Sequence, residues 1–109
     1  MKREAERLDD ILSAISKIQE KAQSRGEFFS NEMLQVWVKY HLQLIGEATN
    51  RVSSQTQTAN PQVPWQDFIG LGNTLVKKYF KTDLELIWQV IEEKLPPLKQ
   101  HIHSISQKE

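Results

Sequence analysis

The chain has 109 residues, of which 39% are apolar, enough to build the core of one ordinary domain. Fourteen basic residues balance fourteen acidic ones, so no net charge draws the chain towards nucleic acid or an anionic membrane. Cysteine is absent, no apolar run approaches the roughly 20 residues that span a bilayer, and the charged start MKREAERLDD is unlike a secretory signal, so we expect a soluble cytoplasmic protein without disulfides.

The first half of the chain carries two amphipathic helical patterns. Over residues 3–24, apolar side chains recur at steps of three and four, at Leu8, Ile11, Ile15, Ile18 and Ala22. Gly26 is predicted to end this first helix. Ser30 is predicted to cap a second helix that runs to about residue 52. The apolar face of the second helix is broad, which predicts neighbours on two sides.

The second half begins with a change of composition. Residues 53–64 carry no charge, no aromatic ring and two prolines, which predicts a polar flexible loop. A third helix is expected from residue 65 to about residue 80. Thr82 and Glu85 form the Thr-x-x-Glu pattern of a capping box, so a fourth helix should begin there and run to about residue 95. Pro96-Pro97 should break it before a short fifth helix.

The predicted fold class follows from these elements. No alternating apolar pattern indicates a strand, so we expect an all-α protein, an antiparallel bundle of four to five helices in one domain spanning residues 1–109. The wide apolar faces of the second and third helices predict a homodimer that buries them across a two-fold axis. The alternative is a bundle whose own core uses those faces fully.

The three histidines give no metal site. His101 and His103 are two residues apart, a spacing that does not share a helix face, and no cysteine or carboxylate cluster completes a ligand set. His41 lies on the apolar face of the second helix, where a buried, hydrogen-bonded histidine is the ordinary interpretation and a catalytic one the alternative. No cofactor motif is present.

Gly46 and Glu47 interrupt the second helix within LQLIGEATNRVS. A mid-helix glycine costs about 1 kcal/mol relative to alanine, and a close approach of a neighbouring helix would explain it. Glu47 would then be a buried acceptor that orders that neighbour. The alternative is a tolerated surface glycine beside a solvated carboxylate.

The segment GLGNTLVKKYFKTD, residues 70–83, belongs to the third predicted helix. Asn73 and Lys77 are four residues apart and share a face. Lys77, Lys78 and Lys81 lie near the helix C-terminus, where cations are favoured. The position of these lysines at a helix C-terminus therefore explains their presence without a functional site.

The order of motifs is more specific. LDDILSAISKIQE, LQLIGEATNRVS and VPWQDFIGLGNTLVKKYFKTDLELIWQVIEEKLPPLK together resemble the HepT-like branch of the HEPN superfamily over nearly the whole chain. The resemblance implies a small helical bundle that dimerises and is encoded beside a minimal nucleotidyltransferase of the MNT type. In such toxin–antitoxin pairs the toxin is a metal-independent ribonuclease. The antitoxin can inactivate the toxin by transferring AMP to a tyrosine.

The active motif of this branch, Arg-Asn-x-x-x-His-x-Tyr, is altered in this chain. Asn73 and Tyr79 match it, whereas Gly72 stands at the arginine position and Lys77 at the histidine position. Cleavage of RNA without a metal needs a proton acceptor and a cation that holds the developing charge. Lysine is almost wholly protonated at neutral pH, and glycine supplies no guanidinium. Lys77, Lys78 and Lys81 remain candidates for phosphate contact.

These substitutions leave several functions open. The chain is expected to be an inactive relative that keeps its nucleotidyltransferase partner, with RNA as a further partner. It could instead be a ribonuclease that uses other groups, for example Lys77 with His41, or a form altered deliberately or selected during cloning. A substrate-binding subunit of a nucleotidyltransferase is another class. Tyr79 is the candidate for AMP modification, because its hydroxyl would lie near a helix end beside lysines.

Overall fold

The computed structural model describes residues 3–78 and 81–108, and every regular element in this part of the chain is helical. The helices are α1 (Glu4–Lys21), α2 (Arg25–Ser30), α3 (Glu32–Asn50), α4 (Ser54–Ala59), α5 (Trp65–Lys77), α6 (Leu84–Gln89), the π-helical turn η2 (Val90–Lys94) and α7 (Leu95–Lys108). No helix within these described ranges is long and apolar enough to cross a membrane. The fold is an all-α bundle, as the sequence predicts.

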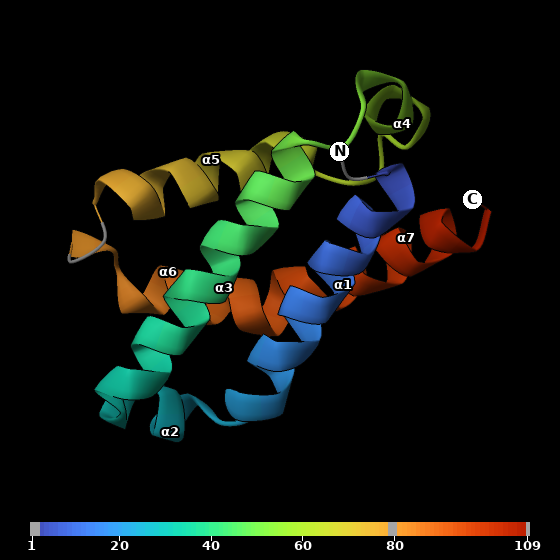
Figure 1. The fold of residues 1–109 in the computed structure, drawn as a ribbon. Helices are drawn as coiled ribbons and strands as arrows, with labels where there is room; N and C mark the ends of the chain where they lie inside the picture. Colours follow the sequence, from blue (N-terminus) through green and yellow to red (C-terminus); the bar gives the residue numbers. More distant parts are fainter. Residues whose placement is uncertain (1–2, 79–80, 109) are drawn as a thin grey trace.

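Helix α3 is the centre of the bundle. It contacts α1 on one flank and α5 on the other, and α7 contacts α1 (Figure 1). The α6–η2–α7 stretch passes behind α3 and α1 in Figure 1. Every long helix contributes apolar side chains to the core, whereas Trp37 and Leu44, on the broad apolar face predicted for the second helix, are exposed. Fully buried side chains are Leu8, Ile11, Ile15, Ile18, Val38, Ile45, Leu75, Ile87, Leu95 and Ile102.

The connection between α1 and α3 differs from the prediction. Gly26 does not end the first helix, because α1 ends at Lys21 and Gly26 lies inside the short helix α2. Ser30 does not cap α3. The cap is Asn31, whose Oδ1 accepts a hydrogen bond from the backbone N–H of Leu34 at 3.0 Å, whereas the Ser30 hydroxyl donates to the carbonyl of Glu27. An amide side chain one residue later thus takes the capping role.

The segment 53–64 contains the short helix α4, where the sequence predicts only a loop. Ser53 caps α4 by accepting from the backbone N–H of Thr56 at 3.1 Å. The carboxylate of Glu4, on α1, accepts hydrogen bonds from the Ser53 hydroxyl at 2.6 Å and from the Thr56 hydroxyl. This anchor comes from a helix about fifty residues away in the chain, so the local pattern of residues 53–64 could not reveal it.

The Glu4 contact predicts a pH-dependent contribution to stability. Partial burial raises the pKa of Glu4, and hydrogen bonds from Ser53 and Thr56 lower it by more, so the pKa lies below its ordinary value of 4.5. A carboxylate with a lowered pKa stabilises the folded state above its unfolded pKa and loses this effect as the pH falls through the folded value. Because Glu4 is only partly buried, we expect Glu4→Gln to cost about 1 kcal/mol at pH 7.

Urea unfolding of the unaltered protein and of Glu4→Gln at several pH values measures this contribution. The difference in free energy of unfolding should be largest at pH 7 and should shrink as the pH drops below 4.5. Glu6→Gln is the matched control, because Glu6 is an exposed carboxylate of the same turn. A difference between the unaltered protein and Glu4→Gln that stays constant with pH would contradict the assignment.

The C-terminal helical stretch differs from the prediction at two points. Thr82 does not cap α6. Its hydroxyl donates to the carbonyl of Lys78, and Asp83 is the cap, accepting from the N–H of Glu85 at 2.9 Å. Pro96-Pro97 does not interrupt the helical stretch. Both prolines lie in the first turn of α7, which follows η2 without a gap. In the π turn the N–H of Leu95 donates to the carbonyl of Val90, five residues back. A proline ring clashes with the carbonyl four residues back in a regular helix, and the wider turn gives it room.

Candidate functional site at the crossing of α3 and α5

Two glycines lie where α3 and α5 cross. A Cβ atom on Gly46 would lie 2.9 Å from the Cα of Gly72 and 2.9 Å from the carbonyl oxygen of Phe68. A Cβ atom on Gly72 would lie 3.1 Å from the Cα of Gly46. The two backbones therefore touch directly, and both glycines are buried. The closest helix approach in this part of the fold depends on the absence of side chains at these positions.

The crossing forms one wall of a groove of about 250 Å³ between α3 and α5. Gly46 and Glu47 line it from α3, and Gly72 and Asn73 line it from α5. Four residues that the sequence analysis singled out separately thus come together. Glu47 is exposed and pairs with Arg51 at 3.2 Å, so it is a solvated carboxylate rather than a buried acceptor.

The chemistry available in the groove is limited. The remaining lining residues are Gln43, Asn50, Ile69 and Val76. Amide groups can hydrogen-bond to a ligand, and the Glu47 carboxylate can accept a proton, but no lining residue is a lysine, an arginine or a histidine. The described residues that line the groove therefore supply no cation to hold the charge that develops on a cleaved phosphodiester, and the guanidinium beside it, that of Arg51, pairs with Glu47.

The lysines of the motif region lie past the groove. Lys77 is the last residue of α5, and Lys77, Lys78 and Lys81 are all exposed. None of them lines the groove. Tyr79 and Phe80, which the sequence places in the same helix, lie outside the described residues. The structure thus leaves the lysines accessible for phosphate contact without joining them to the groove.

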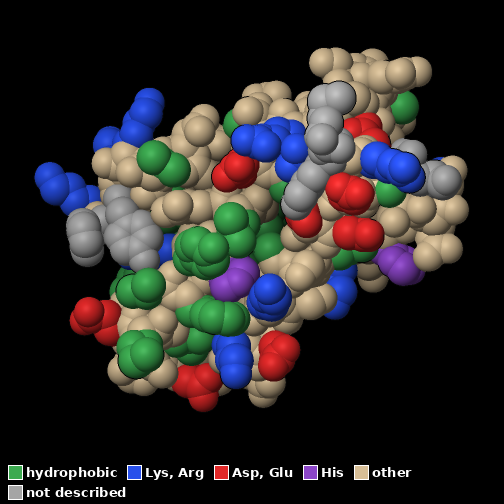
Figure 2. All heavy atoms as spheres, viewed as in Figure 1, with side chains coloured by type: hydrophobic (Ala, Val, Ile, Leu, Met, Phe, Trp, Pro, Cys, Tyr) green, Lys and Arg blue, Asp and Glu red, His purple; other side chains and the backbone are tan. Residues whose placement is uncertain are grey.

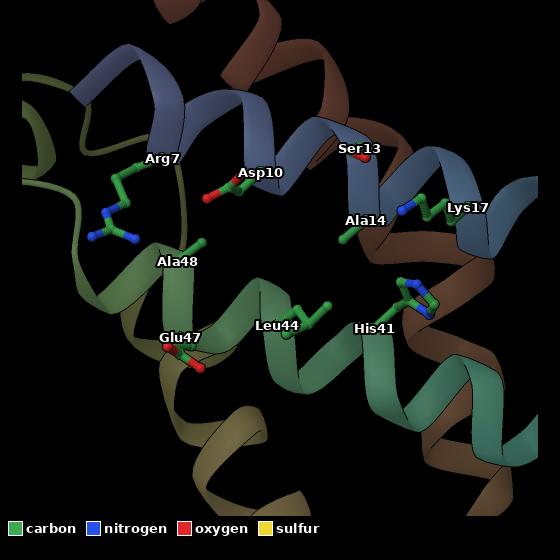
Figure 3. A pocket seen from close by; sticks show the side chains of 9 residues that line it. All are labelled: Arg7, Asp10, Ser13, Ala14, Lys17, His41, Leu44, Glu47 and Ala48. Carbon is green, nitrogen blue, oxygen red and sulfur yellow. The ribbon is translucent and has the colours of Figure 1, made fainter. Parts of the chain in front are cut away.

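His41 faces α1 and not α5. It is buried, with 3% of its surface exposed, and its Nδ1 lies 2.8 Å from the backbone carbonyl oxygen of Trp37. The His41 ring lines a cleft between α1 and α3 (Figure 3). Lys77 does not line that cleft, so the structure does not bring together the pair considered for alternative catalysis.

The C-terminal histidines lie on α7, apart from any cluster of possible metal ligands within residues 3–78 and 81–108. His103 is exposed, and its Nε2 lies 3.4 Å from the side-chain nitrogen of Gln107. His101 is half-buried on the neighbouring face of α7. Among the residues that the structure describes, no three histidine or carboxylate side chains gather where they could hold a metal ion.

An apolar stripe runs along the exposed face of α3. It consists of Met33, Val36, Trp37, Tyr40 and Leu44, with exposed fractions from 38% to 83%. Figure 2 shows apolar side chains gathered over α3 on this face. Val76 of α5, 70% exposed, also lines the groove beside it. Large apolar side chains grouped on a surface typically mark an interaction site.

Comparisons with known proteins decide the family. The model of the family described as "HepT-like: Ribonuclease HepT-like" matches residues 11–105, which is most of the chain. The chain belongs to the HepT-like ribonuclease family. "Putative RNase MJ1380" of Methanocaldococcus jannaschii is 33% identical to it over 100 residues, covering 90% of this chain and 92% of that protein. "Probable ribonuclease HepT" of Thermococcus cleftensis is 29% identical over 94 residues, covering 84% of this chain and 86% of that protein. No solved structure matches the chain.

The family motif connects this groove with the site that the resemblance implies. In this HepT-like chain, Gly72 and Asn73, two positions of the motif that the resemblance identifies, line the groove. The family resemblance implies an arginine at position 72. In this chain the backbone of Gly72 packs directly against the backbone of Gly46. Sequence reasoning found these positions but missed the cleft between α1 and α3, because helical periodicity does not tell which polar residues of α1 face which residues of α3.

Proposed function

We propose that the protein is a catalytically inactive member of the HepT-like family that acts as the binding partner of an MNT-type nucleotidyltransferase in a toxin–antitoxin-type pair. The observation that carries the proposal is Gly72, which supplies no cation to a groove whose described lining residues include no lysine, arginine or histidine. Lys77, at the histidine position, is exposed, and a lysine ammonium is a hydrogen-bond donor without an acceptor. The proposal also locates the protein in the cytoplasm, where RNA and ATP are available.

A homodimer is part of this proposal. The apolar stripe on α3 and the neighbouring Val76 would be buried between two copies, which places the two grooves near the two-fold axis. A charged side chain in such an interface is strongly unfavourable. We therefore expect the double variant Met33→Glu, Tyr40→Glu to be monomeric, whereas the unaltered protein has twice the 12.7 kDa mass of the chain.

Light scattering at micromolar concentration measures this difference. Leu86→Glu is the matched control, because Leu86 is an exposed apolar residue, at 46%, on α6 rather than α3. It should leave the mass of the unaltered protein unchanged. A mass of one chain for the unaltered protein would rule out the dimer.

The nucleotidyltransferase partner is tested by protein modification. The lysines at the end of α5 would attract the triphosphate of ATP and pair with an attached AMP group. We expect incubation with the enzyme encoded beside this protein, ATP and Mg²⁺ to add AMP to Tyr79, which intact-mass measurement detects. The gain should disappear in Tyr79→Phe and persist in Tyr40→Phe, the control at the other tyrosine of the chain.

Three outcomes separate the possibilities. A mass gain that persists in Tyr79→Phe would show that AMP is attached to another residue. No mass gain, with a stable complex of the two proteins, would favour a binding subunit. No mass gain and no complex would contradict the partnership.

A further inference from the structure

A cleft of about 270 Å³ lies between α1 and α3, on the other flank of α3 from the groove (Figure 3). Lys17 of α1 and His41 of α3 lie at one end, and Arg7 and Glu47 lie at the other. Its apolar part is formed by Ala14, Leu44 and Ala48. The cleft thus combines a polar end, which carries a cation and an imidazole, with an apolar wall.

The orientation of the His41 ring is fixed by its own helix. The carbonyl of Trp37 can only accept a hydrogen bond, so Nδ1 of His41, 2.8 Å away, carries the proton. The centroid of the His41 ring lies 4.4 Å from that of Trp37 and 5.1 Å from that of Tyr40, whose ring is nearly perpendicular to it. Within the described part of the chain no residue hydrogen-bonds to Nε2, which remains the ring nitrogen available to a ligand in the cleft.

Trp37 also fixes the position of Lys17. Its indole Nε1 donates to the backbone carbonyl of Lys17 at 3.3 Å and so ties α1 to α3 beside the cleft. One residue therefore holds both the lysine backbone and the tautomer of the histidine. The Lys17 side chain is exposed and extends to the same end of the cleft as the His41 ring (Figure 3).

The cleft is lined by two cations and two carboxylates, and its Lys17 end suits a single anionic group. An ammonium binds phosphate as a point charge, and Nε2 of a neutral imidazole can accept a proton. A phosphate monoester has one exchangeable proton near neutral pH, because its second pKa is about 6. A continuous nucleic-acid strand fits poorly, because its phosphates would pass the carboxylates of Asp10 and Glu47.

We propose that this cleft binds a small phosphate monoester whose organic group is apolar. The ammonium of Lys17 donates to the phosphate, and the exchangeable proton of the monoester lies between a phosphate oxygen and Nε2 of His41. The wall formed by Ala14, Leu44 and Ala48 contacts the organic group. Of the residues that line this site, only Glu47 also lines the groove between α3 and α5, and binding here requires neither ribonuclease activity nor the nucleotidyltransferase.

Imidazole NMR tests the site directly, because the chain has three histidines and only His41 lines the cleft, whereas the other two lie on α7. In the purified protein, His41 should be the Nδ1–H tautomer when neutral. Addition of phenyl phosphate should shift the His41 resonances with saturation and leave those of His101 and His103 in place. Inorganic phosphate should bind more weakly, and phenol should cause no shift.

Variants of α1 separate a built site from general attraction to lysines. Lys17→Gln should weaken binding of phenyl phosphate about tenfold or more, because it removes a charge-assisted hydrogen bond. Lys21→Gln is the matched control, one turn further along α1 and outside the cleft, and should leave binding unchanged.

Several results would overturn the proposal. These are an equal loss of affinity in Lys17→Gln and Lys21→Gln, equal shifts at all three histidines, binding of phenol as tight as that of phenyl phosphate, or no shift at millimolar ligand. Inorganic phosphate that binds as tightly as phenyl phosphate would remove the role of the apolar wall. Displacement of phenyl phosphate by micromolar single-stranded RNA would show that the ligand of the cleft is an RNA strand and not a phosphate monoester.

Discussion

Gly46→Ala is expected to lower the free energy of unfolding by up to about 2 kcal/mol. In an open helix this substitution stabilises by about 1 kcal/mol, because alanine has the higher helix propensity. Here the added methyl group would lie 2.9 Å from the Cα of Gly72 and from the carbonyl oxygen of Phe68. Both are backbone atoms that cannot turn away, so α5 must move, and overpacking of this kind costs about 1–3 kcal/mol.

Urea unfolding followed by circular dichroism measures the change. Gly70→Ala is the matched control, because Gly70 is also inside α5 and a Cβ atom there would meet nothing within 4 Å. It should stabilise the protein by up to about 1 kcal/mol. If Gly46→Ala and Gly70→Ala change stability in the same direction, the backbone contact at the crossing is not what keeps residue 46 a glycine.

Restoring the family motif is expected to create ribonuclease activity. The unaltered protein should leave RNA intact in the presence of a chelator. The double variant Gly72→Arg, Lys77→His should cleave at least about a hundredfold faster than the unaltered protein, because it regains a proton acceptor and a guanidinium. Lys77 is exposed, so histidine fits there without repacking.

The arginine at position 72 carries a structural cost that the assay must control. Its Cβ atom would start 3.1 Å from the Cα of Gly46, so α5 must give by a few tenths of an ångström. Thermal unfolding of each variant shows whether the fold survives. Gly72→Arg with Lys78→His is the matched control, since it adds the same side chains with the histidine one residue out of register.

The cleavage results separate the remaining explanations. Equal activity of the two double variants would mean that the motif positions have no special role. Robust cleavage by the unaltered protein that is lost in Lys77→Ala would show that the chain is an active ribonuclease with other chemistry. A folded but inactive Gly72→Arg, Lys77→His variant would show that the groove lacks more than these two side chains.

The sequence alone determined the fold class and the family. Helical periodicity marks which residues are buried, since the 3.6-residue repeat puts every third or fourth side chain on one face, and Leu8, Ile11 and Ile15 follow it into the core. The resemblance to the family also implies that Gly72 and Lys77 stand at altered positions of its motif, because Asn73 and Tyr79 keep the spacing. Helix ends were less well determined, since neighbouring residues such as Ser30 and Asn31 are both competent caps.

The tertiary structure decided what depends on contacts between distant segments. Helix α4 is held by Glu4 of α1, and the sequence of residues 53–64 does not indicate that this carboxylate contacts it. The prolines at 96 and 97 fit within a helical stretch because a π turn precedes them. The sequence predicted a close approach of another helix at Gly46 but did not show that Gly72 is the residue in contact. It also did not show that Lys17 and His41 line the same cleft. Periodicity fixes which face of a helix is buried, whereas the partner of that face depends on how the helices cross.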